Sequence, residues 1–237
     1  NFKGISGKGI YADVIQEIDW SVGQIVSALS QHGVRDNTLI VFLSDNGPWQ
    51  SYGNHAGDSG GLRGGKFDVW EGGFRVPAIA SWPARIPLGK VNNHVLSTID
   101  VLPTLAYVAG TKPSGRTIDG VNMIESLTGD FTDELGNRHL YYFLGSQLAA
   151  VRKSQWKYVF EHTGHAVLEA GADGENGRSD FSVEVKEALY DLSSDRAEST
   201  NVIKRHPSVS SSLRTAGLNF ARTLAAEARP SGIDPPN

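Results

Sequence analysis

Residues 38–48 constrain the fold most, because an apolar run there ends directly in polar residues. Residues 38–44 (Thr-Leu-Ile-Val-Phe-Leu-Ser) have the composition of a buried β-strand. In residues 10–31, apolar side chains recur at three-, four- and seven-residue spacings, which predicts one long amphipathic helix that ends near Gly33. A helix that leads into a continuous apolar strand is typical of an α/β sheet buried on both faces. We therefore predict an α/β fold.

The pattern of elements changes after about Asp133. Before it, the sequence predicts two further short strands and two helical segments: 75–82, 94–98, 100–109 and 119–127. After it, the sequence predicts four strands at 139–144, 148–153, 155–162 and 188–192. It also predicts an exposed glycine-rich loop at 171–182 and a final amphipathic helix at 209–228. We predict that residues 1–135 are part of a large α/β domain, and that residues 136–237 form a small antiparallel α+β subdomain.

Composition narrows the functional classes. With 237 residues and 39% hydrophobic residues, the chain can bury a substantial core. A net charge of -4 gives no electrostatic footprint for nucleic acid. The absence of cysteine excludes disulfides and thiolate sites, and no apolar run is long enough to span a bilayer. The first residue, Asn1, is not methionine, so we expect a processed or trimmed chain or a fragment.

Asp45 and Asn46 follow the central strand directly. In open α/β sheets, ligands gather beyond the carboxyl ends of the strands. A carboxylate and an amide oxygen are good ligands for a hard divalent cation such as calcium or magnesium. The same tetrapeptide, Asp45 to Pro48, is also a strong turn sequence, so the pattern leaves both interpretations open.

Lys66 closes a glycine-rich stretch, residues 60–66, that has the spacing of a phosphate-binding loop. Phe67 replaces the required Ser or Thr, which argues against an NTPase. The lysine suits another oxyanion, although it could equally be a solvated loop residue. His55, in its own glycine-rich loop, could donate to a substrate oxygen or simply be exposed. We predict that Arg75 pairs with Glu71 or with a metal-ligating carboxylate.

Together these motifs resemble the C-terminal half of a sulfatase of the arylsulfatase family, within the alkaline-phosphatase-like superfold. The resemblance rests on an ordered set that covers nearly the whole chain: Tyr11 to Gly23, Thr38 to Gly47, Gly64-Gly65-Lys66, Glu71-Gly72-Gly73, Arg75-Val76-Pro77, Trp82-Pro83, Asp100 to Leu105, Asp119-Gly120, Leu189 to Leu192, Asp195, Glu198 and Asn201. The implied fold is the C-terminal portion of a large mixed-sheet domain with a small antiparallel subdomain.

The resemblance implies roles for four residues. Asp45 and Asn46 correspond to two calcium ligands, and Lys66 corresponds to the lysine that contacts the sulfate and the bridging oxygen. His55 resembles a residue of a loop that lines the substrate pocket. The implied partner is a sulfated small molecule or carbohydrate, and the implied location is periplasmic or secreted. The oligomeric state is left open.

The chain also departs from the family pattern. The family nucleophile is a formylglycine made from a C/S-x-P-x-R motif, and further metal ligands precede it. Here only Ser81 to Arg85 matches, but it coincides with the family's Trp-Pro strand end, and Pro87 would break the helix that the nucleophile caps. We therefore expect the isolated chain to be inactive and to bind calcium weakly or not at all.

Two rival interpretations remain open. A phosphatase or phosphonate hydrolase of the same superfold would usually have Asp-His where this chain has Asp45-Asn46. A non-catalytic remnant that binds sulfate or carbohydrate would lack a C/S-x-P-x-R motif in the complete reading frame.

Overall fold

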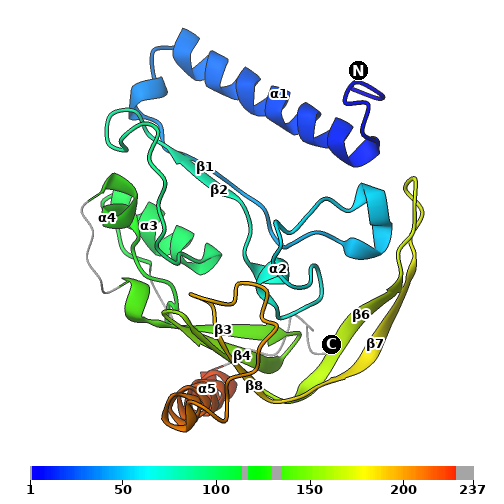
Figure 1. Cartoon of the computed structure of the whole chain (residues 1–237). Helices are drawn as coiled ribbons and strands as arrows, with labels where there is room; N and C mark the ends of the chain where they lie inside the picture. Colours follow the sequence, from blue (N-terminus) through cyan, green and yellow to red (C-terminus); the bar gives the residue numbers. More distant parts are fainter. Residues whose placement is uncertain (1, 114–116, 130–134, 228–237) are drawn as a thin grey trace, which may run out of the picture.

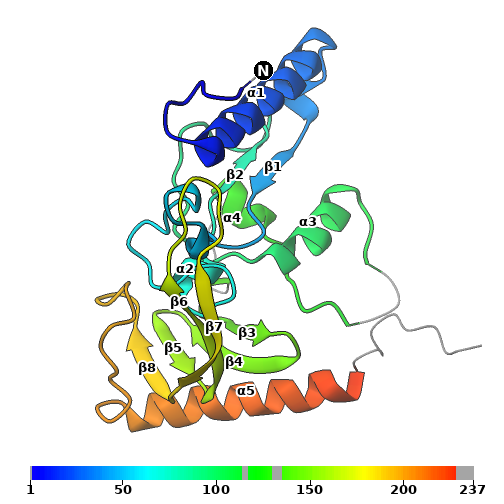
Figure 2. The ribbon, with the colours of Figure 1, turned by 90° about the vertical axis from the view of Figure 1, so that its right-hand side faces the viewer.

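The computed structural model describes residues 2–113, 117–129 and 135–227. Within these ranges the chain is a mixed α/β structure with three antiparallel sheets of two, four and two strands. Figures 1 and 2 show the long helix α1 at one end of the molecule and helix α5 at the other. The two-stranded sheet β1–β2, the short helix α2 and the four-stranded sheet lie between them.

The first half of the chain begins with α1 (Ile10–Gln31) and continues through η1 (Arg35–Asn37) into β1 (Ile40–Leu43). The predicted helix and central strand are therefore confirmed. β1 pairs antiparallel with β2 (Ala78–Ser81), which lies inside the strand predicted at 75–82.

The predicted burial of the first-half elements is not seen among the described residues. All four residues of β1 are only partly buried, and Ile79 of β2 is 63% exposed. Within α1, the buried residue is Asp13, whereas seven apolar side chains are exposed: Ile10, Tyr11, Val14, Ile15, Ile18, Trp20 and Ile25. The amphipathic pattern therefore forms the predicted helix, but its apolar side chains remain uncovered in the described ranges.

The middle of the chain contains short elements joined by loops. In order they are η2 (Gln50–His55), α2 (Glu71–Phe74), η3 (Thr98–Asp100), α3 (Val101–Val108) and α4 (Ile124–Thr128). The two predicted helical segments are confirmed, but the strand predicted at 94–98 is wrong. The side chain of Asp100 accepts the backbone N–H of Ser97 in a capping box that starts η3, so this stretch turns into a helix instead.

The second sheet has the strand order β3-β4-β5-β8. After η4 (Leu135–Asn137), its strands are β3 (His139–Leu144), β4 (Gln147–Lys153), β5 (Trp156–Val159) and β8 (Ala188–Asp191). Alternate residues face opposite sides. Tyr142, Ala150 and Val159 pack against Val69 and Trp70, which precede α2. On the other face, a separate core contains Val151, Tyr158 and Leu189 of the strands, Val202 of the loop after β8, and Leu213 of α5 (Pro207–Glu227). The predicted strands and final helix are confirmed.

In the exposed loop predicted at 171–182, residues 171–177 do join two strands, but residues 178–182 belong to the second strand. The two strands, β6 (His162–Glu169) and β7 (Arg178–Val185), form a long hairpin. It rises from the four-stranded sheet towards the segment that contains η2 (Figure 1). Glycine and charge indicated a loop, but Phe181 and Val183 alternate with polar residues in a strand pattern. His162 and His165 both lie within β6 and are buried.

The predicted domain boundary at residues 135 and 136 remains a prediction, and Asp133 and the tail 228–237 lie outside the described residues. No helix in the described ranges combines the length and the apolar character that a membrane crossing requires.

Gly217 provides a test of how closely α5 packs on the sheet. A Cβ atom at this position would lie 2.6 Å from Val151 Cγ2 and 2.8 Å from Phe160 Cζ. Gly217→Ala should therefore lower the free energy of unfolding by about 1–3 kcal/mol in urea titrations. Gly23→Ala in α1 is the matched control, because its Cβ would meet nothing within 4 Å. The control should gain roughly 0.5–1 kcal/mol from helix propensity. Equal effects at both positions would refute the tight contact.

Candidate functional site

Two loops, residues 45–48 after β1 and residues 60–73, meet through their backbones. Gly47 N donates to Gly73 O at 2.9 Å, and Lys66 N donates to Pro48 O at 2.8 Å. A Cβ on Gly47 would lie 1.7 Å from Gly72 O, and a Cβ on Gly65 would lie 2.2 Å from Pro48 O. The glycines are therefore needed for close backbone approach rather than for flexibility. This contact brings the segment that contains Lys66 to the end of β1.

The predicted metal ligands lie at this strand end. The Asp45 carboxylate is on an exposed residue, and its Oδ1 accepts the N–H of Asn46 at 2.9 Å. The Asn46 side chain donates through Nδ2 to Gly47 O at 2.9 Å, so its carbonyl oxygen is the group left to act as a ligand. The two residues therefore offer two hard oxygen donors.

The donor set fits calcium only in part. Calcium takes six to eight oxygens, and within the described ranges no group of three or more His, Cys, Asp or Glu residues is arranged to hold a metal. A cation at Asp45 and Asn46 would therefore need further oxygen ligands besides these two side chains.

The ammonium of Lys66 lies beside aromatic rings. Its Nζ is 4.9 Å from the ring centroid of Trp49 and 5.6 Å from that of Phe67. Such positions favour a cation through the ring quadrupole. In the described part of the chain, no carboxylate forms an ion pair with Lys66. The positive charge is therefore free to bind an anion at the surface.

His55 closes η2 and is partly buried. Its ring packs against the backbone at the start of α1, so that a Cβ on Gly9 would lie 2.4 Å from Nε2. Its Nδ1 is buried without a hydrogen-bond partner among the described residues, and it lies close to Gly174 in the loop of the β6–β7 hairpin. The substrate-binding role of His55 remains a prediction.

A buried ionic cluster ties residues 60–73, which we call the glycine loop, to the four-stranded sheet. Lys157 Nζ, on β5, lies 3.1 Å from Glu71 Oε1 and 2.9 Å from Glu198 Oε1, and it donates to Val69 O at 2.6 Å. All three charged side chains are at most 3% exposed. Glu198 Oε2 also accepts the N–H of Glu71 at 2.7 Å. The first turn of α2 is therefore held by Lys157 of the four-stranded sheet and by Glu198 of the loop after β8.

Glu71 has two further partners on the sheet. Tyr142 OH donates to Oε1 at 3.0 Å, and Arg152 pairs with Oε2. Burial alone would raise the pKa of the Glu71 carboxyl, but the charges of Lys157 and Arg152 outweigh it and hold that pKa below its usual value. Burial raises the pKa of Glu198, and the charge of Lys157 offsets this only in part.

The predicted pairing of Arg75 with Glu71 is therefore wrong. Arg152 and Lys157 occupy the carboxylate, whereas Arg75 is exposed and meets Glu71 through a backbone bond, Arg75 N to Glu71 O at 2.7 Å. Arg75 is close to Glu71 in the sequence, which favoured the pairing. The Glu71 carboxylate instead contacts Arg152 and Lys157 on the sheet.

Arg63 and Asp68 brace the loop on either side of Lys66. The Arg63 guanidinium lies 3.5 Å from the ring centroid of Trp70 and donates to Glu198 O at 2.8 Å. Asp68 Oδ2 accepts the N–H of Gly65 at 3.0 Å, and its Oδ1 is 3.5 Å from His165 Nδ1 on β6. Burial raises the pKa of the Asp68 carboxyl. Both braces link the loop to residues of the second half of the chain.

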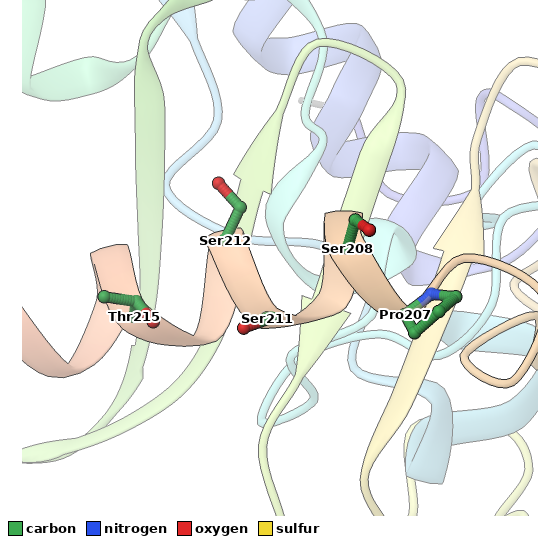
Figure 3. Close-up of a pocket in the computed structure, with 5 residues that line it drawn as sticks. All are labelled: Pro207, Ser208, Ser211, Ser212 and Thr215. Atoms are coloured by element: carbon green, nitrogen blue, oxygen red, sulfur yellow. The ribbon is translucent and has the colours of Figure 1, made fainter.

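The other sequence candidates are accounted for elsewhere. Ser81, in the rejected C/S-x-P-x-R match, ends β2 and accepts a hydrogen bond from Arg35, while Arg85 lies over the ring of Trp82. The hollow shown in Figure 3 lies along the first turns of α5 and is lined by Pro207, Ser208, Ser211, Ser212 and Thr215. Its lining has no charged side chain, and α5 packs on the sheet face opposite α2. We assign it no function.

Sequence reasoning missed the residues that support the site. Lys157 carried a signal, since it is a lone charge in the apolar run Trp156 to Val159. A buried charge requires a partner, but sequence spacing does not reveal that the partners of Lys157 are the distant Glu71 and Glu198.

The sequence is similar to known sulfatases. Residues 8–111 match the Sulfatase family model. The chain is 40% identical to the N-acetylgalactosamine-6-sulfatase of Canis lupus familiaris over 161 residues, which cover 67% of this chain and 30% of that protein. It is 34% identical to human arylsulfatase A over 209 residues, which cover 86% of this chain and 41% of that protein. The predicted resemblance is confirmed.

Solved structures agree with the fold. One from work on the metabolism of multiple glycosaminoglycans by Bacteroides thetaiotaomicron has a TM-score of 0.76 and 29% identity, and it aligns over 93% of this chain and 46% of its own. A second, in complex with k-i-k-neocarrahexaose, has a TM-score of 0.73 and 26% identity, over 93% and 44% of the two chains. This chain therefore spans less than half the length of these relatives, and the predicted fold is confirmed.

Replacement of Lys157 tests the ionic cluster. Lys157→Met removes the cation from two buried carboxylates and should lower the free energy of unfolding by about 3–5 kcal/mol. The matched control is Lys204→Met, at an exposed loop position, which should change it by less than about 0.5 kcal/mol. Urea titrations measure both. A similar small effect at both sites would contradict the cluster's structural role.

The pH dependence of stability tests the charge of Glu71. Its pKa is lowered in the folded protein, so its contribution is fully present above the ordinary value of 4.5 and is lost as the pH falls below it. The stability difference between the parent and Glu71→Gln should therefore be largest at pH 7 and shrink towards pH 4. Urea titrations of both proteins at each pH give this difference. A difference that does not change with pH would show that the carboxylate acts only as a neutral hydrogen-bond acceptor.

Proposed function

Since residues 8–111 of this chain are a sulfatase-family segment, we propose that the protein hydrolyses sulfate esters and that this chain supplies part of the active site. One observation carries the proposal most directly. The glycine loop holds Lys66 against the end of β1, where Asp45 and Asn46 lie, through the Lys66 N to Pro48 O bond of 2.8 Å. A cation and two oxygen ligands on contacting segments suit an anionic ester.

Lys66 is the residue that binds the sulfate group. Its ammonium is a compact point charge with three donors, and no carboxylate in the described ranges neutralises it. It stabilises the negative charge that develops on the sulfate and on the bridging oxygen as the S–O bond breaks. His55, which lies beside Gly9 and Gly174, is the second residue that we propose to contact the substrate.

Asp45 and Asn46 would hold one divalent cation, which we propose to be calcium. When bound, the ion polarises the sulfate oxygens as a Lewis acid. The chain's own contribution is to fix the two donors, since the Asn46 amide is oriented by its bond to Gly47 O and the Asp45 carboxylate by the N–H of Asn46. The incomplete ligand set supports the expectation of weak calcium binding by this chain alone.

We further propose that the nucleophile, a formylglycine, lies on sequence outside these 237 residues. The only local match, Ser81 to Arg85, is engaged in strand and aromatic contacts. The uncovered apolar side chains of α1 support the view that this chain is one portion of a larger domain. We infer that the substrate is a sulfated carbohydrate or a sulfated small molecule, and that the protein acts in the periplasm or is secreted.

The activity assay uses an aryl sulfate with calcium present. The 237-residue chain should show no turnover, whereas the protein encoded by the complete reading frame should be active. In that protein, Lys66→Gln should lower kcat/KM by about 10²–10³-fold, because it removes a charge that stabilises the transition state. Lys90→Gln, at an exposed loop lysine, is the matched control and should retain activity.

Three results would count against the proposal. Clear calcium-dependent turnover by the 237-residue chain would refute the missing nucleophile. Equal activity of Lys66→Gln and Lys90→Gln would remove Lys66 from the reaction. Hydrolysis of an aryl phosphate in preference to the aryl sulfate would favour the phosphatase alternative.

A further inference from the structure

Aromatic residues from three separate segments gather beside Lys66. Trp49 comes from the loop after β1, Phe67 follows Lys66 directly, and Phe181 lies on β7. The ring centroids of Trp49 and Phe67 are 5.6 Å apart at an interplanar angle of 84°, and those of Phe67 and Phe181 are 5.5 Å apart at 73°. The three rings therefore form one continuous edge-to-face cluster, which we call the aromatic platform.

The aromatic platform is open to solvent. Trp49 is 36% exposed, Phe67 is 40% exposed and Phe181 is 57% exposed. Single exposed apolar side chains are common, but three contacting aromatic rings beside an unpaired lysine are not explained by core packing. Phe181 lies on β7, so the long β6–β7 hairpin brings a residue far along the chain to the ring of Phe67.

The backbone at Phe67 is strained. Its φ of 76° lies in the left-handed region that residues other than glycine rarely adopt. This conformation costs on the order of 1–3 kcal/mol and persists only where the surroundings impose it. Below the ring, Asp68 is held by the Gly65 N–H, and His165 lies 5.7 Å from the Phe67 ring centroid. The strained residue is therefore fixed with its ring at the surface.

We propose that the aromatic platform binds a sugar ring of a sulfated saccharide, while Lys66 binds the sulfate. A sugar ring has an apolar C–H face that packs on an exposed aromatic face, and it also carries polar edges that stay in water. Lys66 Nζ lies 4.9 Å from the Trp49 ring, so the anion site and the apolar site adjoin. The inference rests on the proposed function and narrows its substrate to a carbohydrate.

The chemistry around the platform excludes simpler ligands. Inorganic sulfate would need Lys66 but no aromatic surface. One aryl ring would need a single stacking partner, whereas three rings in contact offer a longer apolar surface that a saccharide of more than one unit can cover.

Protein-observed NMR titrations of the 237-residue chain, which give a Kd for every probe, provide the test. The probes are a chondroitin 6-sulfate tetrasaccharide, its desulfated form, 4-nitrophenyl sulfate and sodium sulfate. Phe181→Ala should raise the Kd for the sulfated tetrasaccharide about fivefold or more and leave that for sodium sulfate unchanged. Phe181→Tyr should retain binding, because the ring remains. Leu168→Ala is the matched control, since Leu168 is 53% exposed on the other strand of the same hairpin.

The outcomes separate the two proposals. No binding of the tetrasaccharide, or equal Kd values for the parent, Phe181→Ala and Trp49→Ala, would overturn the platform. A loss on Phe181→Ala that affects only 4-nitrophenyl sulfate would overturn the choice of a sugar. If Lys66→Gln leaves every sulfated probe unaffected while Phe181→Ala still weakens the saccharide, the platform stands and the sulfate role of Lys66 fails.

Discussion

The buried charge of Lys157 is the interaction on which the site depends. Lys157 joins the carboxylates of Glu71, which lies 86 residues before it, and Glu198, which lies 41 residues after it. A buried ion is tolerated only when its partners are in place, so the four-stranded sheet and the glycine loop must assemble together. The loop that contains Lys66 is therefore positioned by the second half of the chain as well as by the strand that precedes it.

The glycines of the loop act at a second level. They bring the backbones of residues 63–73 and 45–48 into direct hydrogen-bonded contact, at distances that no side chain would allow. Charge fixes the loop against the sheet, and close backbone approach fixes it against the end of β1. Together these constraints hold the backbone of Lys66 against the segment that follows the proposed metal ligands. Its ammonium lies near the rings of Trp49 and Phe67 and has no acidic partner among the described residues.

The site combines groups with different duties. Asp45, Asn46 and Lys66 carry the proposed chemistry on sulfate, and the aromatic platform adds an apolar surface next to them. The β6–β7 hairpin links these duties, because it supplies Phe181 to the platform and His165 beneath Phe67. Substrate preference could therefore change through the hairpin while the groups that act on sulfate stay in place.

The sequence by itself determined the elements with strong local patterns: α1, β1, the strands β3, β4, β5 and β8, and α5. It also determined the family, because motifs in a fixed order are specific where a single motif is not. Local spacing could not reveal that residues 171–182 lie largely in a hairpin, that Arg152 and Lys157 rather than Arg75 pair with Glu71, or that Phe181 meets Phe67. These outcomes depend on contacts between residues far apart in the chain, whose partners only the tertiary structure brings together.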